Sequence, residues 1–143
     1  MQQPSKVYIS ARFSRREEMV EVSKQIKSIG YEDVSRWLVL EEGKNPSEEA
    51  LRNRAHVDRD DVYACDILVR FTDDLSTSTV PSGWCTASRF EETGMAQALG
   101  KIIIIVGGSQ SLFDRLESRI HVATVKELLM VLRDILYSSL EAN

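Results

Sequence analysis

Apolar and polar positions alternate along the chain in blocks that predict strands and helices in turn. Short apolar runs predict strands at residues 7–10, 36–40, 66–71, 101–106 and 120–122. Apolar residues at helical spacing predict helices that begin near residues 14, 45, 88 and 124, with a short helical turn at 111–117. Strands that alternate with helices favour an α/β fold built on a parallel sheet with right-handed crossovers.

The order of these blocks predicts how the sheet is arranged. We expect a single-domain, flavodoxin- or Rossmann-like doubly wound parallel five-stranded sheet with helices on both faces, formed by residues 1–143. The most apolar strand, 101–106, is expected at a central position covered on both faces. Ligands bind such sheets at the carboxyl ends of the strands, near the switch in strand order. The segments 10–16, 72–89 and 107–113 are predicted to converge there.

Several helix starts carry capping patterns. Ser14 to Glu17 resembles a capping box, Asn45 to Glu48 supplies a cap and a first-turn proline, and Thr124 to Glu127 caps the last helix. Gly30 is expected to end the first long helix. Its inward stripe is Met19, Val22, Ile26 and Ile29.

The second long helix has a predicted inward stripe with one polar member. The stripe consists of Leu51, Ala55, Asp58, Val62 and Cys65. A carboxylate on an apolar stripe costs desolvation unless it finds a partner or reaches a cleft, so Asp58 is a candidate site residue. Arg59, Asp60 and Asp61 are read as the solvated face of the same helix.

The composition of the chain argues against several classes of binding partner. A net charge of −4 gives no basic field for a nucleic-acid polymer. The two cysteines and two histidines lack metal-ligand spacing, so we expect no metal and no cofactor. No charged and apolar leader opens the chain, and the longest apolar run, 102–106, is too short to span a bilayer. We expect a cytoplasmic protein with no membrane partner.

Two adjacent acids follow the long polar loop before the third helix. Ser88 and Glu91 have the spacing of a capping box, which assigns Glu91 a structural role. Glu92 is then expected in the first helical turn, where the helix dipole favours an ionised carboxylate near neutral pH. Such a carboxylate suits a nucleophile that attacks a sugar anomeric carbon. The alternative is that both glutamates are ordinary first-turn acids of a surface helix.

The run from Ser88 to Lys101, Ser-Arg-Phe-Glu-Glu-Thr-Gly-Met-Ala-Gln-Ala-Leu-Gly-Lys, resembles a family signature. It is similar to the Glu-x-Gly-x-Ala-x-Ala-x-Gly-Lys motif of the nucleoside 2-deoxyribosyltransferase superfamily, which includes nucleoside monophosphate N-glycosidases. The resemblance implies that Glu92 is a covalent nucleophile. It also implies that Asp58 or Asp73, at positions where the family has aspartates, orients or protonates the leaving base.

The resemblance also implies substrate-binding residues. Ser10, Arg12 and Phe13 lie where the family's first-strand loop wraps the sugar and base, although the usual Gly-Pro is absent. Phe13 could stack on a base or belong to the core, and Trp84 could be a lid aromatic or loop packing. Thr86, Ser88 and Arg89, at a helix N-terminus, could hold a 5′-phosphate.

The expected partners are a small-molecule nucleoside or nucleotide and a free base. A homo-oligomer is expected as well, because family members often complete the site with a neighbouring subunit. Two alternatives stay open: a glycohydrolase of NAD-like dinucleotides, and a non-catalytic nucleotide-binding module. A phospho-receiver domain fits poorly because no acidic pair follows the first strand, and a dinucleotide oxidoreductase fits poorly because no Gly-x-Gly-x-x-Gly follows a strand.

Overall fold

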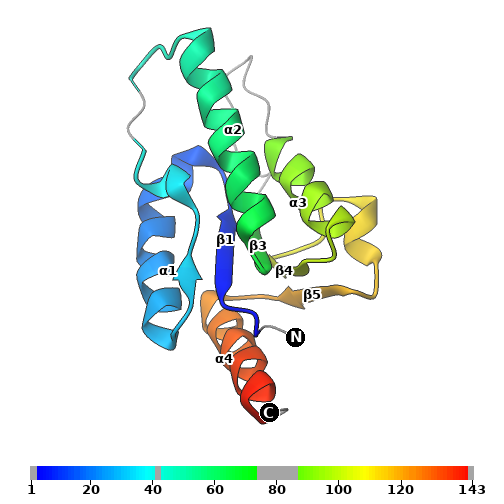
Figure 1. Cartoon of the computed structure of the whole chain (residues 1–143). Helices are drawn as coiled ribbons and strands as arrows, with labels where there is room; N and C mark the ends of the chain where they lie inside the picture. The colour runs from blue at the N-terminus through cyan, green and yellow to red at the C-terminus, as the bar shows by residue number, and fades with distance from the viewer. Residues whose placement is uncertain (1–2, 41–42, 74–86, 142–143) are drawn as a thin grey trace.

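A five-stranded, fully parallel sheet organises the computed structural model, which describes residues 3–40, 43–73 and 87–141 (Figure 1). The strands are β1 (Lys6–Ser10), β2 (Glu32–Asp33), β3 (Ile67–Phe71), β4 (Ile102–Val106) and β5 (Arg119–Val122). The helices are α1 (Arg16–Ile29), α2 (Glu48–Ala64), α3 (Ser88–Ala98) and α4 (Val125–Glu141), with short 3-10 helices η1 (Phe13–Arg15), η2 (Arg36–Leu38) and η3 (Leu112–Arg115).

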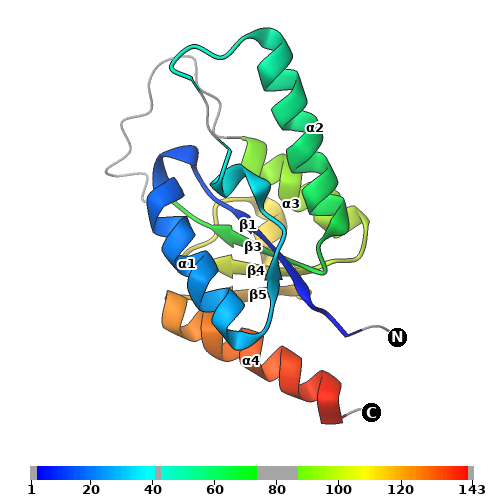
Figure 2. The same cartoon turned by 60° about the vertical axis from the view of Figure 1, so that its left-hand side comes forward.

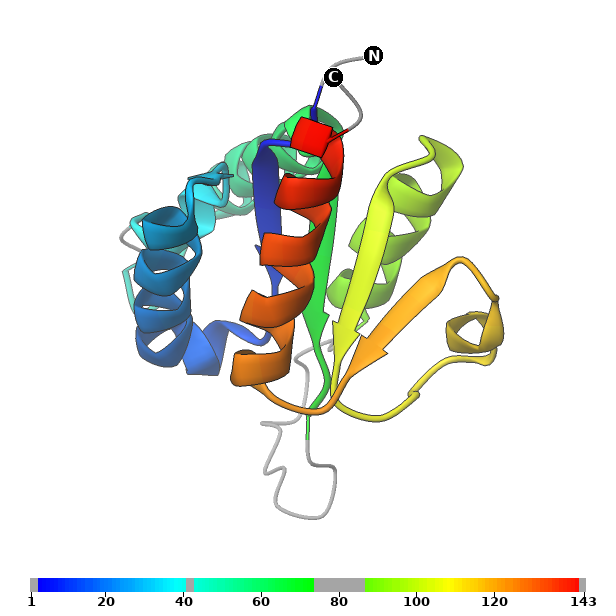
Figure 3. The same ribbon diagram turned by 90° about the horizontal axis from the view of Figure 1, so that it is seen from below.

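The strand order is β2-β1-β3-β4-β5, so the chain winds outward from β1 in both directions. Helices α1 and α4 cover one face of the sheet, and α2 and α3 cover the other (Figures 2 and 3). This arrangement confirms the doubly wound α/β fold. It places the switch in strand order between β1 and β3, where ligands bind in folds of this kind.

The core lies between the sheet and its two helical layers. The middle strands β1, β3 and β4 supply its largest continuous part, because each is covered on both faces. Strand β4 is interior, as its run of isoleucines predicts, and Ile103, Ile104 and Ile105 are at most 2% exposed. No helix within the described ranges is long and apolar enough to cross a membrane.

The predicted second strand at 36–40 is wrong. Residues Arg36–Leu38 form η2, and the edge strand β2 is the two-residue segment Glu32–Asp33. The Trp37 indole donates to the Ile9 carbonyl at 2.8 Å, and the Ser35 hydroxyl accepts from the Ile9 amide at 2.6 Å. The apolar run therefore packs over the end of β1 through side chains, instead of extending the sheet through its backbone.

The predicted inward stripe of α2 holds only for its second half. Val62 is fully buried, but Leu51 is 39% exposed and Ala55 is also exposed. Figure 1 shows the first half of α2 projecting beyond the end of the sheet, so the sheet does not cover it. Asp61, which the sequence places on the solvated face, is buried and accepts hydrogen bonds from the Arg36 amide at 3.0 Å and its Nε at 2.8 Å.

The helix starts match the capping predictions unevenly. Arg15 occupies the N-cap of α1 without a side-chain cap, so the box predicted at Ser14 is wrong. The cap of α2 is Ser47, whose hydroxyl accepts from the Ala50 amide at 3.1 Å, and not Asn45. At α4 the cap is confirmed, since the Thr124 hydroxyl accepts from the Glu127 amide at 3.2 Å. The glycine stop of α1 is also confirmed: Gly30 has φ +123°.

A buried ionic cluster fixes the loop after β4. The Asp114 carboxylate accepts hydrogen bonds from Arg70 of β3 and from Arg119 of β5, the latter at 2.6 Å. It also accepts from the amides of Gln110 and Ser111, at 2.9 and 3.1 Å. Asp114 and Arg70 have side chains that are 0% exposed. One carboxylate therefore offsets two buried guanidinium groups and ties the loop to both strands.

Replacing Asp114 with asparagine is expected to lower the free energy of unfolding by about 3 kcal/mol or more, because two buried cations lose their counter-ion. Urea unfolding followed by circular dichroism measures the change. Asp134→Asn, on the exposed side of α4, is the matched control and should change stability by less than about 0.5 kcal/mol. Equal effects of the two substitutions would contradict the proposed weight of the cluster.

Candidate active site

The candidate site lies where β1 and β3 end, at the switch in strand order. Strand β1 contributes Tyr8 and Ser10, α2 contributes Asp58, and α3 contributes Glu92. Tyr8 and Ser10 are two residues apart on a strand, so their side chains point to the same face of the sheet. That face is the one covered by α2 and α3.

Glu92 is held by two hydroxyl groups of β1. The Tyr8 hydroxyl donates a hydrogen bond to Glu92 Oε2, and the Ser10 hydroxyl donates to Oε1 at 3.1 Å. Each carboxylate oxygen therefore has its own donor, which limits rotation of the group. Burial raises the pKa of Tyr8 well above its usual value, so the phenol stays protonated and remains a donor.

The protonation expected for Glu92 is corrected by the structure. Helix α3 starts at Ser88 with Ala87 as N-cap and no side-chain cap, so the Ser88–Glu91 capping box does not form. The first turn includes Glu91 but not Glu92. Burial raises the pKa of Glu92 to about 7, against the hydrogen bonds from Tyr8 and Ser10, which lower it. Near neutral pH the group is therefore divided between its acid and its carboxylate.

Asp58 stands beside Glu92 as a second acid. Its negative charge raises the pKa values of both Tyr8 and Glu92, which places the three groups in one electrostatic cluster. Arg54, one helical turn earlier on α2, pairs with Asp58 through Nε and Oδ2 at 3.6 Å. The structure thus brings Asp58 to the predicted nucleophile.

Asp73 lies instead at the centre of a cluster of arginines at the end of β3. Its carboxylate pairs with Arg12 at 2.7 Å, with Arg89 at 2.9 Å and with Arg15 at 3.7 Å. Its side chain is only 5% exposed. The Gln110 side chain donates to the Asp73 carbonyl at 2.8 Å and so holds its backbone from the other side. Asp58, by contrast, raises the pKa of Glu92.

Arg89 is buried within the same cluster. It donates to the Phe71 carbonyl at 3.0 Å as well as pairing with Asp73. Burial lowers its pKa, the Asp73 charge acts against that, and the nearby Arg12 and Arg70 lower it further. Arg12 is more accessible than Arg89: their side chains are 19% and 5% exposed.

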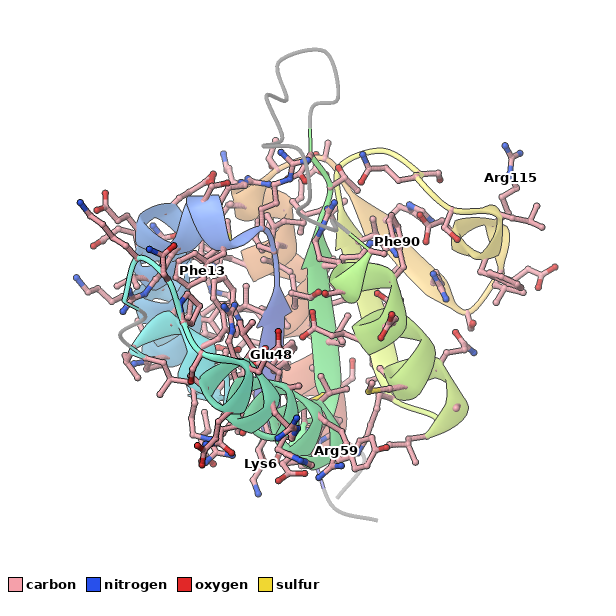
Figure 4. All side chains as sticks on the ribbon, turned by 90° about the horizontal axis from the view of Figure 1, so that it is seen from above. Lys6, Phe13, Glu48, Arg59, Phe90 and Arg115 are labelled. Carbon is pink, nitrogen blue, oxygen red and sulfur yellow. The ribbon has the colours of Figure 1, made fainter. Side chains whose placement is uncertain are left out.

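The remaining predicted substrate-binding residues have different outcomes. Phe13 is half-buried, with its ring centroid 6.4 Å from that of Trp37 and 4.7 Å from the Arg54 guanidinium carbon. Figure 4 shows Phe13 on the side of α1 and Phe90 on the side of α3, with β1 and β3 between them. Ser88 is exposed at the start of α3. Trp84 and Thr86 lie outside the described residues.

Tyr8 and Arg54 are site residues that the sequence reading missed. Tyr8 sits in the apolar run of β1 and resembles an ordinary core aromatic. Arg54 sits among the charged residues of α2 and resembles a solvated side chain. The one sequence signal for Arg54 is its spacing of four residues before Asp58, which suits an ion pair on one helix face.

Comparisons with known proteins match the chain in structure only. No protein-family model matches it, and no curated protein matches its sequence. The solved CMP N-glycosidase BcmB of Clostridium botulinum is 19% identical with a TM-score of 0.56, over 90% of this chain and 98% of that one. The 2-deoxyribosyltransferase of Bacillus psychrosaccharolyticus is 22% identical with a TM-score of 0.59, over 90% and 96%.

A third solved structure shows that proteins of a different kind share this fold. A response regulator receiver domain of Bacillus halodurans is 12% identical with a TM-score of 0.53, over 93% of this chain and 97% of that one. At these identities the likenesses establish only the fold. It is the fold that the resemblance to the nucleoside 2-deoxyribosyltransferases implies. The chemistry has to be argued from the side chains.

Glu92→Gln is expected to stabilise the protein at alkaline pH. A carboxyl whose folded pKa of about 7 exceeds its usual 4.5 binds its proton more tightly in the folded state, so its contribution to stability falls as pH rises between those values. At pH 8 the variant should gain on the order of 3 kcal/mol over the wild type, and at pH 4.5 less than about 0.5 kcal/mol. Urea unfolding at both pH values measures the difference.

The matched control is Glu91→Gln, at the neighbouring exposed position of the same helix. It should show no such dependence on pH. If Glu92→Gln had the same effect at pH 4.5 and pH 8, the raised pKa would be wrong.

Proposed function

We propose that the protein cleaves the N-glycosidic bond of a nucleoside or nucleoside monophosphate, with Glu92 as the covalent nucleophile. The observation that carries this proposal is the Glu92 carboxylate itself. It is held by Tyr8 and Ser10 beside a second acid, Asp58, at the switch point of the sheet. Two acids with separate environments are the usual equipment for substitution at an anomeric carbon.

The proposed reaction has two steps. A Glu92 oxygen attacks the anomeric carbon, the N-glycosidic bond breaks, and its electron pair leaves with the base, which Asp58 orients or protonates. A glycosyl ester of Glu92 results. In a transferase a second base then attacks the same carbon, and in a hydrolase water does so; either step releases the carboxylate and gives net retention.

The arginine cluster around Asp73 supports a phosphorylated substrate. Arg12 and Arg89 both pair with one carboxylate, so positive charge is in excess at this end of the sheet. The N-terminus of α3 adds backbone amides and the exposed Ser88 hydroxyl. We propose that this region binds the 5′-phosphate of a nucleoside monophosphate. The structural likeness to a CMP N-glycosidase is consistent with that choice of substrate.

Incubation with deoxynucleosides and their monophosphates, with and without an acceptor base, tests the reaction. Wild-type protein is expected to release or exchange the base, and Glu92→Gln to lose activity by about a thousandfold or more. Mass spectrometry of protein quenched during turnover should detect the sugar adduct on the wild type and not on Glu92→Gln. Glu91→Gln should retain activity.

Base release without acceptor would identify a hydrolase, and exchange that requires acceptor would identify a transferase. Absence of turnover of every substrate by the wild type would refute the proposal. NAD-like dinucleotides would then be assayed. A nucleotide that raises the melting temperature and stays intact would indicate a binding module.

Arg12→Met tests the phosphate site. Loss of one charge-assisted hydrogen bond should raise KM for a monophosphate about tenfold and leave the KM for the matching nucleoside unchanged. Lys24→Met, an exposed lysine on α1, is the control. Arg89→Met should act in the same direction and also lower stability, because Arg89 holds the Phe71 carbonyl. Equal KM changes for both substrates would refute a phosphate role.

A further inference from the structure

Arg54 is a cation that pairs with one of the two acids of the candidate site. It pairs with Asp58 across 3.6 Å, and its guanidinium carbon lies 4.7 Å from the centroid of the Phe13 ring. The side chains of Arg54 and Asp58 are 22% and 24% exposed. Phe13 in turn packs against Trp37, which is hydrogen-bonded to β1. The Arg54 guanidinium is therefore oriented by its ion pair with Asp58 and by its contact with the Phe13 ring, which Trp37 holds in place.

The two acids repel one another, and Arg54 acts against that repulsion. The Asp58 charge raises the pKa of Glu92, whereas the Arg54 charge lowers it. A nucleophile must be ionised, so every contribution that favours the Glu92 carboxylate increases the active fraction near neutral pH.

We propose that Arg54 is a positioning residue of this active site. Its guanidinium, held against Phe13, pairs with the Asp58 carboxylate and screens the charge of that carboxylate from Glu92, which favours the ionised form of Glu92. This inference rests on the proposed role of Glu92 as the nucleophile. It also favours one of the two roles of Asp58: a carboxylate paired with Arg54 would orient the base by accepting a hydrogen bond from it.

Other charged and titratable groups face this cluster from each surrounding element. Tyr8 and Ser10 of β1 donate hydrogen bonds to Glu92. The guanidinium carbon of Arg16 of α1 lies 6.0 Å from the centroid of the Phe13 ring. Arg36 of η2 lies within electrostatic range of Asp58 but is bound first to Asp61 of α2. Arg54 pairs with Asp58 and lowers the pKa of Glu92.

The test measures the titration of Glu92 by carbon-detected NMR of the side-chain carboxyl, which needs no turnover. The wild-type midpoint is expected at about 7. Arg54→Met keeps the length of the side chain and its contact with Phe13 but removes the charge, and should raise the midpoint by about half to one pH unit. Arg54→Lys restores the charge and should restore most of the midpoint. Asp58→Asn removes the repelling charge and should lower the midpoint.

The kinetic measurement is the pH profile of kcat/KM. In Arg54→Met, the acidic limb should move to higher pH by the same amount as the NMR midpoint. In Arg54→Lys, it should lie close to its wild-type position. Arg52→Met, an exposed arginine on the same helix, should leave both the midpoint and the limb in place. A merely structural role would lower the whole profile and leave the limb where it is.

An unchanged Glu92 midpoint in Arg54→Met would overturn the inference, as would a Lys variant that behaves like the Met variant. Failure of the proposed function would look different: the Glu92 midpoint would respond to Arg54 and Asp58 as expected, while no substrate is turned over. Melting temperatures of all variants establish that each is folded under the conditions used.

Discussion

The hydrogen bonds from β1 to the Glu92 carboxylate are the constraint on which the candidate site depends. A carboxylate that is partly buried beside another acid is costly unless donors stabilise its charge. Tyr8 and Ser10 provide these donors from one face of one strand. Strand β1 is itself held by its pairing with β2 and β3, and Ser35 and Trp37 bind its Ile9 backbone as well.

The site is electrostatically divided. On one side are the two acids, Glu92 and Asp58, with Arg54 as their counter-charge. On the other are the arginines around Asp73, which leave positive charge in excess. A nucleoside monophosphate has the same division, with an electrophilic anomeric carbon at one point and a phosphate at another. The match in charge supports the proposed substrate class more directly than the fold does, since a receiver domain shares that fold.

The arginines around Asp73 depend on the buried ionic cluster that Asp114 forms with Arg70 of β3 and Arg119 of β5. Asp114 holds the loop after β4 through the amides of Gln110 and Ser111, and Gln110 in turn holds the backbone of Asp73. The cluster therefore connects β5 to the residue around which Arg12 and Arg89 gather. A buried charge network of this kind contributes little net stability but has few alternative arrangements, which suits it to fixing a loop.

The sequence by itself determined the α/β class, the approximate strands and helices apart from the second strand, and the presence of Glu92 on the third helix, because these depend on periodicity and on a local motif. It could not determine the protonation of Glu92 or the partners of Asp58 and Asp73. Tyr8 and Glu92 meet across 84 residues of chain, and burial there raises the pKa of Glu92, which the first-turn position expected from the sequence would have lowered. In the sequence, Asp61 and Arg54 also look like solvated charges, although Asp61 is buried and Arg54 pairs with Asp58. Whether a charged side chain on a helix is solvated or buried depends on what the tertiary structure packs against it.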